Sequence, residues 1–207
     1  MNNVEKRKKI VFVLPVVYFL VAWGVPWGDI QWDSTVSISY LFDILFCMIV
    51  LSFYRPRLHL HLAQGLFVRI LAVFILAALS VSVCLVGGLT TPFRFVEELP
   101  LQVLVLAPIL EECVFRFALF EPLRRVIRKK IIMFCTNAAL FSLSHAYALR
   151  VLPDSFHPFI YFQLSYTFLL GWVCAKAKDI SGSLVEPILL HFIFNLMFYL
   201  AVVFWDL

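Results

Sequence analysis

Charged residues are scarce in this sequence, and their scarcity sets the class of protein. Only 17 Lys and Arg and 13 Asp and Glu occur among 207 residues, whereas 63% of the residues are hydrophobic. The mean hydropathy is +0.95, and soluble domains are only about 45–50% apolar. No polar segment is long enough to form a soluble domain, so the composition predicts a single integral membrane domain over residues 1–207.

The cysteines argue against two further classes of protein. They are odd in number, lie scattered through apolar runs and include no C-x-x-C pair: Cys47, Cys84, Cys113, Cys135 and Cys174. Neither a disulfide framework nor a cysteine zinc site is expected from this pattern. The net charge of +4 does not indicate a nucleic-acid partner, because the basic residues lie between apolar runs, where membrane topology explains them.

Long apolar runs make up most of the chain instead. Seven stretches have roughly the 17–25 predominantly apolar residues that a membrane helix needs. They show no period-two alternation, and lipid admits only helices or closed barrels. The expected fold is therefore all-α, a polytopic membrane bundle of about seven transmembrane helices. The expected spans are 10–26, 37–54, 66–86, 99–120, 131–149, 158–175 and 184–204.

Basic residues are concentrated in alternate loops along the chain. Four Lys and Arg precede the first span and five lie within residues 121–130, whereas the loop over residues 27–34 has two Asp and no basic residue. The positive-inside rule then places the N-terminus in the cytoplasm. The sequence thus predicts a multi-pass protein of the cell membrane.

Three charged residues interrupt the fourth span: Glu111, Glu112 and Arg116. A single Asp, Lys or Arg at mid-bilayer depth costs roughly 2.5–3.5 kcal/mol on the insertion scale, so intramembrane charges usually mark function. Glu112 and Arg116 are four residues apart, which predicts an ion pair on one helix face. Glu111 points about 100° away from that face and lacks the partner. Pro108, just upstream, removes a backbone hydrogen bond and is expected to kink the helix.

Two other spans also carry polar side chains. The fifth holds His145, and the seventh holds His191 and Asn195 one helical turn apart. A carboxylate, two imidazoles and an amide can supply a base, a proton carrier and hydrogen-bond donors. Taken singly, each His or Asn can equally serve to form a hydrogen bond between helices, which stabilises the bundle by under about 2 kcal/mol.

Asp43 and Arg69 are charged residues in or near the second and third spans. Charges in such positions pair with one another or extend to the membrane surface. We expect these two either to pair with each other or to reach an interface.

Three short motifs resemble those of a known family. EECVFR fits E-E-x-x-x-R, FSLSH fits F-x-x-x-H, and HFIFN fits H-x-x-x-N, in that order over about residues 100–200. Together they resemble the CPBP family (CAAX proteases and bacteriocin-processing proteins, also called ABI). These are glutamic intramembrane endopeptidases and include the type II CAAX prenyl endopeptidases. The first three spans carry no signature of this family.

The resemblance implies a role for each motif residue. Glu111 is the general base that activates a water molecule, and His145 helps to hold that water. His191 and Asn195 form the oxyanion pocket. The remaining two motif residues, Glu112 and Arg116, support the site through their pair.

The resemblance also implies cofactor and partners. No cofactor and no metal are expected, although Glu111, His145 and His191 form a chemically possible zinc ligand set. Two features argue against a zinc site: the sequence has no H-E-x-x-H motif, and the E-E-x-x-x-R motif carries a second Glu in place of a third His.

The expected partners are the lipid bilayer and a membrane-associated protein or peptide substrate. The substrate is a prenylated C-terminus, a leader peptide or a C-terminal sorting anchor, and the compact form fits the bacterial branches of the family. The alternatives to a protease are a non-catalytic immunity or scaffold protein and, third, a proton-coupled transporter.

Overall fold

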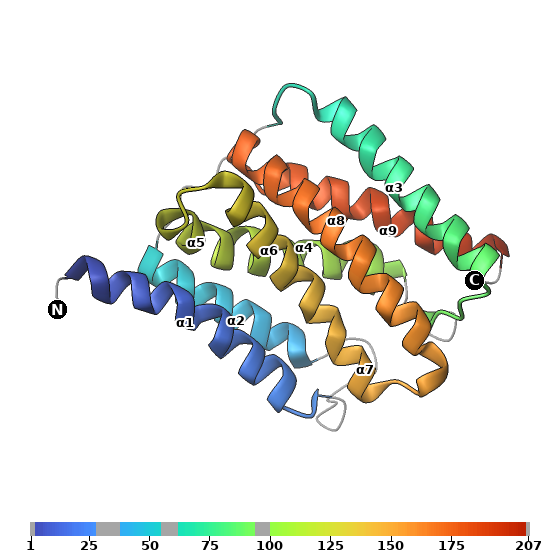
Figure 1. The fold of residues 1–207 in the computed structure, drawn as a ribbon, viewed down its shortest axis with the longest axis horizontal. Coiled ribbons are helices and arrows are strands. Elements are labelled where there is room, and N and C mark those ends of the chain that lie inside the picture. The colour runs from blue at the N-terminus through green and yellow to red at the C-terminus, as the bar shows by residue number, and fades with distance from the viewer. Residues whose placement is uncertain (1–2, 28–37, 55–61, 94–99, 206–207) are drawn as a thin grey trace.

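The protein folds as a bundle of helices (Figure 1). The structure, a computed structural model, describes residues 3–27, 38–54, 62–93 and 100–205, and every element in these ranges is helical. The long helices are α1 (Asn3–Gly24), α2 (Ile38–Tyr54), α3 (Leu66–Gly87), α6 (Lys130–Ser144), α8 (His157–Ser181) and α9 (Val185–Trp205). A seventh runs from residue 100 to residue 126. The predicted all-α bundle of about seven helices is confirmed.

This seventh helix changes its hydrogen-bond register along its length. It consists of η3 (Pro100–Leu106), a π-helical segment, α4 (Ala107–Glu112), a second π-helical segment η4 (Cys113–Leu119), and α5 (Phe120–Val126). Short π-helical insertions inside α-helices are rare and are frequent at functional sites. The two π segments lie on either side of the two glutamates.

Short helical segments join α6 to α8. They are η5 (His145–Tyr147), α7 (Ala148–Val151) and η6 (Asp154–Phe156). With these segments included, Lys130–Val151 and Asp154–Ser181 are long and apolar enough to cross a membrane, as are α3 and α9. The apolar parts of α1 and α2 are shorter. Apolar side chains on the outer faces, such as Phe67 and Val86, are largely exposed, as suits contact with lipid. The chain is a multi-pass membrane protein.

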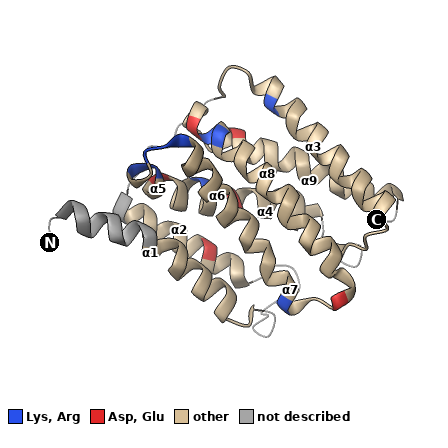
Figure 2. Ribbon diagram, viewed as in Figure 1, with Lys and Arg blue, Asp and Glu red and all other residues tan. Residues whose placement is uncertain are grey.

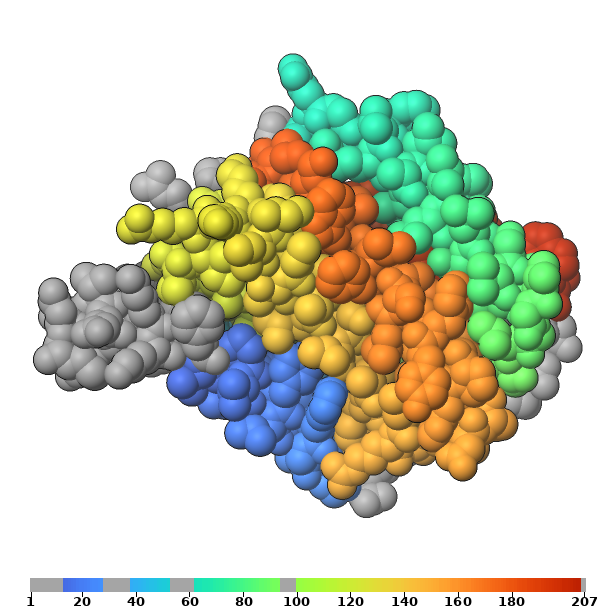
Figure 3. All heavy atoms as spheres, in the orientation of Figure 1, coloured from blue at the N-terminus to red at the C-terminus, as the bar shows by residue number. Residues whose placement is uncertain are grey.

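The helix over residues 100–126 lies inside the bundle, between its two margins (Figure 1). Its η4 segment packs on α2 and its α4 segment on α9, while α6 packs on α8 and α3 packs on α9 and α8. The space-filling view shows α1 and α3 at opposite margins of the bundle (Figure 3). Small buried residues such as Ala138, Ala177 and Ala201 let the backbones approach closely, which is how membrane helices pack.

The turn between α8 and α9 is tight. Gly182 adopts φ 66°, a conformation that favours glycine, and ends α8. Ser183 then accepts the backbone N–H of Val185 on its hydroxyl at 3.1 Å and caps α9. The span that was expected to end at residue 175 therefore continues as α8 to Ser181. Lys178 stays inside the helix because it is buried against Glu121, at 3.5 Å, and the carbonyl of Gly182.

Basic residues gather at one end of the bundle, around the α5–α6 turn and the end of α8 (Figure 2). Arg124 and Lys130 meet Asp179 there, at 3.9 and 2.7 Å. The opposite end carries Arg150 and Asp154. Residues 28–34 of the acid-bearing loop considered above lie outside the described part of the chain.

Candidate active site

Glu112 and Arg116 form the predicted pair, and it is completely buried. The Arg116 Nε lies 3.0 Å from Glu112 Oε2, and both side chains are 0% exposed. This contact is an ion pair without the alignment of a hydrogen bond. Arg116 Nη2 donates to the carbonyl of Gly171 at 3.2 Å, and its guanidinium carbon lies 4.3 Å from the centre of the Phe141 ring. The cation is thus neutralised by one carboxylate, one carbonyl and one aromatic face.

Gly171 on α8 makes this arrangement possible. A Cβ atom there would lie 2.9 Å from Phe141 Cδ1, 3.2 Å from the Cα of Ala138 and 3.4 Å from Arg116 Nη2. Contacts under 3 Å between carbon atoms are repulsive, so any larger residue would displace α6 or the ring on which the guanidinium lies. Nothing in the sequence distinguishes this glycine from the other six as a required one.

Glu112 also holds His191 of α9. Its Oε1 accepts a hydrogen bond of 3.0 Å from His191 Nδ1. A carboxylate paired with an arginine only accepts, so Nδ1 carries the hydrogen. The other ring nitrogen, Nε2, lies 3.9 Å from Glu111 Oε2. His191 therefore connects the two adjacent glutamates, one through each nitrogen.

Glu111 occupies the other face of the helix, as its offset predicts. Its side chain is 29% exposed, whereas that of Glu112 is 0% exposed. No Lys or Arg among the described residues lies within ion-pair distance of Glu111. It is a carboxylate at a cavity wall and not a member of the buried pair.

His145 is fixed by its own helix. Its Nδ1 lies 3.1 Å from the carbonyl oxygen of Phe141, which can only accept, so Nδ1 is the donor. The ring also packs edge-on against the Phe141 ring at 5.2 Å. In the neutral imidazole, Nε2 is then an acceptor able to hold a proton of a water molecule.

Asn195 is held by the helix over residues 100–126. Its Nδ2 donates to the carbonyl of Val103 at 2.8 Å. In a π register, the carbonyl of residue 103 would pair with the N–H of residue 108, but Pro108 has none. The proline thus leaves an acceptor that Asn195 fills, and the second N–H of its amide remains available for another acceptor.

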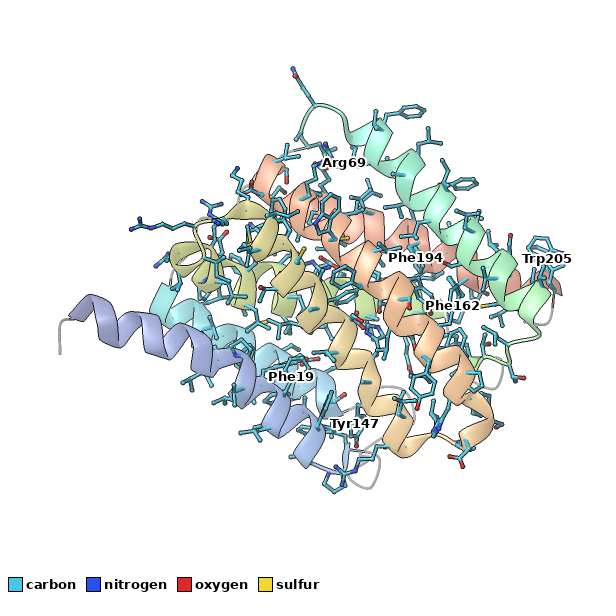
Figure 4. All side chains as sticks on the ribbon, viewed as in Figure 1. Phe19, Arg69, Tyr147, Phe162, Phe194 and Trp205 are labelled. Atoms are coloured by element: carbon cyan, nitrogen blue, oxygen red, sulfur yellow. The ribbon has the colours of Figure 1, made fainter. Side chains whose placement is uncertain are left out.

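Two cavities meet at these residues. The apolar cavity, of about 440 Å³, is lined by Glu111, His145, His191 and Asn195 together with apolar side chains that include Phe93, Leu152, Leu170, Phe194, Phe198 and Val202. Phe194 of α9, labelled in Figure 4, packs against Tyr166 of α8 with ring centroids 5.3 Å apart. The structure therefore brings all four expected catalytic residues to one cavity, with Glu112 and Arg116 directly behind it.

The aromatic cavity, of about 410 Å³, lies on the side of α1 and α2. It is lined by Asp43 and by Tyr18, Trp23, Trp27, Tyr40, Phe42 and Tyr147. Figure 4 shows Tyr147 beside the end of α1. Glu111, His145 and Tyr40 line both cavities, so the carboxylate and the imidazole stand where the two cavities adjoin. No motif in the sequence indicates that α1 and α2 contribute to the site.

Of the two expectations for Asp43 and Arg69, the pairing with each other is wrong. Asp43 accepts a hydrogen bond of 3.0 Å from the hydroxyl of Tyr18 on α1. Arg69 pairs instead with the buried Glu186 at the start of α9, and Glu186 also accepts the N–H of Ala63 at 3.2 Å. Figure 4 shows Arg69 close to the start of α9. The two residues cannot meet because α2 and α3 lie toward opposite margins of the bundle (Figure 1).

Metal-ligand geometry is absent from the described ranges. No group of three or more His, Cys, Asp and Glu side chains in them could hold a metal ion. His145 donates to a carbonyl through Nδ1 and His191 to a carboxylate through Nδ1, so each has only Nε2 left to offer. Metal independence stays a prediction.

Comparison with known proteins gives one family. The model of the family described as type II CAAX prenyl endopeptidase Rce1-like matches residues 63–197, which is 135 of the 207 residues. No curated protein and no solved structure matches the chain. The matched region begins before α3 and includes both residues of the buried pair and the four expected catalytic residues.

Proposed function

The chain belongs to the Rce1-like family of type II CAAX prenyl endopeptidases, and from this premise we propose that it is a glutamic intramembrane endopeptidase. It hydrolyses a peptide bond in a membrane-associated protein or peptide by means of a water molecule activated by Glu111. The observation that carries the proposal is that Glu111, His145, His191 and Asn195 all line one cavity.

The nucleophile is a water held between Glu111 and His145. Water attacks an amide only when a base removes its proton, and a carboxylate at hydrogen-bond distance can do so. His145 offers Nε2 as an acceptor because Nδ1 donates to the Phe141 carbonyl. Two acceptors then orient the two protons of one water and leave an oxygen lone pair directed at the substrate.

The oxyanion of the tetrahedral intermediate is stabilised by α9. One N–H of the Asn195 amide donates to the Val103 carbonyl, and the second N–H is free to donate to the oxyanion. An amide does so without any change in its protonation. His191 donates Nδ1–H to Glu112, so an Nε2–H donor requires a ring that carries both protons. A single well-aimed donor of this kind contributes about 2.7–4 kcal/mol to the transition state.

Glu112 and Arg116 hold the site in shape and do not touch the substrate. Glu112 orients His191, and Arg116 neutralises Glu112 while tying η4 to α8 through the Gly171 carbonyl. A buried carboxylate without its arginine would be expensive in a membrane domain, which explains why both are needed.

Substrate reaches the site from the half of the bundle that faces away from the basic α5–α6 turn. The residues that line the cavities include those at the end of α1, the start of α2 and the last turns of α9. If the basic end is cytoplasmic, as the positive-inside rule requires, the cavities open toward the outer side. We assign the protein to the cell membrane with a cytoplasmic N-terminus, and its compact form fits the bacterial branches of the family.

The test is cleavage of defined peptides by purified protein in phospholipid vesicles. The panel contains one peptide for each substrate class: a prenylated C-terminus, a leader peptide and a C-terminal membrane anchor. Mass spectrometry should find products with the wild type and none with Glu111→Gln, which preserves the shape of the side chain and removes the base. The variant must elute as folded protein at wild-type yield.

Two results would contradict the proposal. Turnover by Glu111→Gln close to that of the wild type would remove Glu111 from the role of general base. Peptides that remain intact with the wild type, yet bind equally to the wild type, Glu111→Gln and Asn195→Ala, would favour a non-catalytic scaffold.

A further inference from the structure

The aromatic cavity holds a carboxylate that the proposed hydrolysis does not use. Asp43 lies on the second turn of α2 and lines this cavity, where its Oδ1 accepts the hydrogen bond from Tyr18. Glu111 lines the same cavity. Two carboxylates from two different helices therefore face one cavity of the membrane domain.

These two are unlike the other acids of the described chain. Each other acid inside the bundle has a Lys or Arg partner: Glu112 with Arg116, Glu121 with Lys178, Asp179 with Lys130, and Glu186 with Arg69. Asp154 lies at the surface, with its side chain 99% exposed. Of the described acids, only Asp43 and Glu111 have no Lys or Arg partner and yet are not fully exposed to solvent.

The walls of the aromatic cavity suit a cation. Carboxylates without a counter-charge are expensive away from bulk water, and the described lining of this cavity includes no Lys or Arg. Trp and Tyr rings attract an ammonium or guanidinium group within about 6 Å of their centres. Trp23, Trp27 and Tyr40 line the cavity together with Asp43. A positive charge placed here would meet opposite charge and aromatic faces at once.

We propose that the aromatic cavity is a specificity pocket for a Lys or Arg side chain of the substrate, next to the scissile bond, with Asp43 as its counter-ion. The proposal rests on the proposed endopeptidase function and adds a substrate class to it. The apolar cavity takes the apolar residues on the other side of the bond, because its described lining has one acid only, Glu111. The preferred substrate thus joins an apolar segment to a cationic residue at the point of cleavage.

Tyr18 positions the counter-ion. Its hydroxyl occupies Asp43 Oδ1 at 3.0 Å and leaves Oδ2 for the incoming cation. The ring of Tyr18 is held in turn by Phe42, Phe46 and Phe115, with centroid distances of 5.0 to 5.8 Å. An acid fixed in this way needs little rearrangement on binding.

The experiment compares peptides that differ at one position. Each has the same apolar segment, followed by Lys, Arg, Gln, Leu or Glu at the variable position, and is presented in phosphatidylcholine vesicles to exclude attraction to anionic lipid. The wild type should cleave the Lys and Arg peptides at least about tenfold faster than the Gln peptide, the scale of one charge-assisted hydrogen bond. The Glu peptide should be the slowest.

Three variants separate the pocket from general effects. Asp43→Asn should reduce the ratio of Lys to Gln cleavage to near one, and Asp43→Lys should make the Glu peptide better than the Lys peptide. Tyr18→Phe should give an intermediate ratio. The matched control is Asp154→Asn, which removes an exposed acid and should keep the wild-type ratio.

A binding measurement makes the result independent of turnover. The Lys and Gln peptides carry a fluorophore and are titrated onto the inactive Glu111→Gln protein, with and without Asp43→Asn. Tighter binding of the Lys peptide that depends on Asp43, without cleavage by the wild type, would keep the pocket and overturn the endopeptidase. Cleavage of all peptides at equal rates, or a Lys preference that survives Asp43→Asn, would overturn the pocket and keep the endopeptidase. Absence of both cleavage and Asp43-dependent binding would overturn the two together.

Discussion

Replacement of Glu112 by Gln tests the buried network most directly. The side chain keeps its shape and loses its charge, so Arg116 remains in the interior without a counter-ion. Arg116 is 0% exposed and has no route to water. At the same time, the new amide can still accept the hydrogen of His191 Nδ1 through its carbonyl oxygen. The substitution therefore removes the ion pair while it preserves one of the two contacts of Glu112.

The expected loss of stability follows from what Arg116 retains. Breaking a buried pair by removing one partner costs about 3–5 kcal/mol. The carbonyl of Gly171, at 3.2 Å, and the Phe141 ring, at 4.3 Å, still stabilise the guanidinium. We therefore expect the low end of that range, about 3 kcal/mol. Native domains have only about 5–15 kcal/mol in total, so the yield of folded protein should fall as well.

The assay is reversible unfolding in mixed micelles, followed by tryptophan fluorescence. The matched control is Asp179→Asn on α8, whose partners Lys130 and Arg124 are 74% and 50% exposed, so that the lost pairs are worth about 1 kcal/mol or less. A double variant, Glu112→Gln with Arg116→Gln, should be less destabilised than the sum of its two single variants, because no lone charge remains.

Two outcomes would refute this reasoning. The first is a Glu112→Gln protein that unfolds at the same denaturant fraction as the wild type. The second is a double variant whose loss equals the sum of the single losses within about 0.5 kcal/mol, the limit of simple additivity.

Four further predictions concern single groups. Asn195→Ala should lower kcat by about 10²–10³ with a much smaller change in KM, and a raised KM with unchanged kcat would argue for a binding role. Gly171→Ala should cost about 1–3 kcal/mol in the same unfolding assay because its Cβ would lie 2.9 Å from Phe141 Cδ1; wild-type stability would contradict the close contact. Pro108→Ala restores an N–H for the Val103 carbonyl and should lower kcat about tenfold. Added to Asn195→Ala, it should cause no further loss of kcat; an additive loss would show that the two residues act independently. Chelators should leave activity unchanged. Stoichiometric zinc in the active protein, with activity lost when the zinc is removed and restored when it is added back, would establish a metalloenzyme.

The backbone of the site was largely predictable from the sequence. Apolar runs of the right length predicted the helices, since lipid leaves few other options. The i, i+4 spacing of Glu112 and Arg116 predicted the ion pair, and the offset of about 100° placed Glu111 on a different face. These inferences rest on local geometry within one helix, which the order of residues determines.

Contacts between helices were not predictable in the same way. A pairing of Asp43 with Arg69 was one of two expectations, yet their partners are Tyr18 and Glu186, which no spacing in the sequence links to them. Local departures from α-helical geometry were not predictable either, because residue spacing alone does not determine the hydrogen-bond register. The helix over residues 100–126 contains two π-helical segments, and α6 continues into a 3₁₀ turn at His145.

Adjacent glutamates in one membrane helix meet opposite requirements, and the helix geometry explains how both are met. A structural carboxylate is stable inside the bundle only with a fixed cation, and Arg116 one turn away supplies it. A catalytic carboxylate must remain free to take a proton, so a permanent cation at its side would weaken it as a base. One residue of offset turns Glu111 out of reach of the guanidinium and toward the two cavities. When a cationic side chain of the substrate enters the aromatic cavity, Asp43 is there to neutralise it, so that Glu111 keeps its capacity to take a proton from the water.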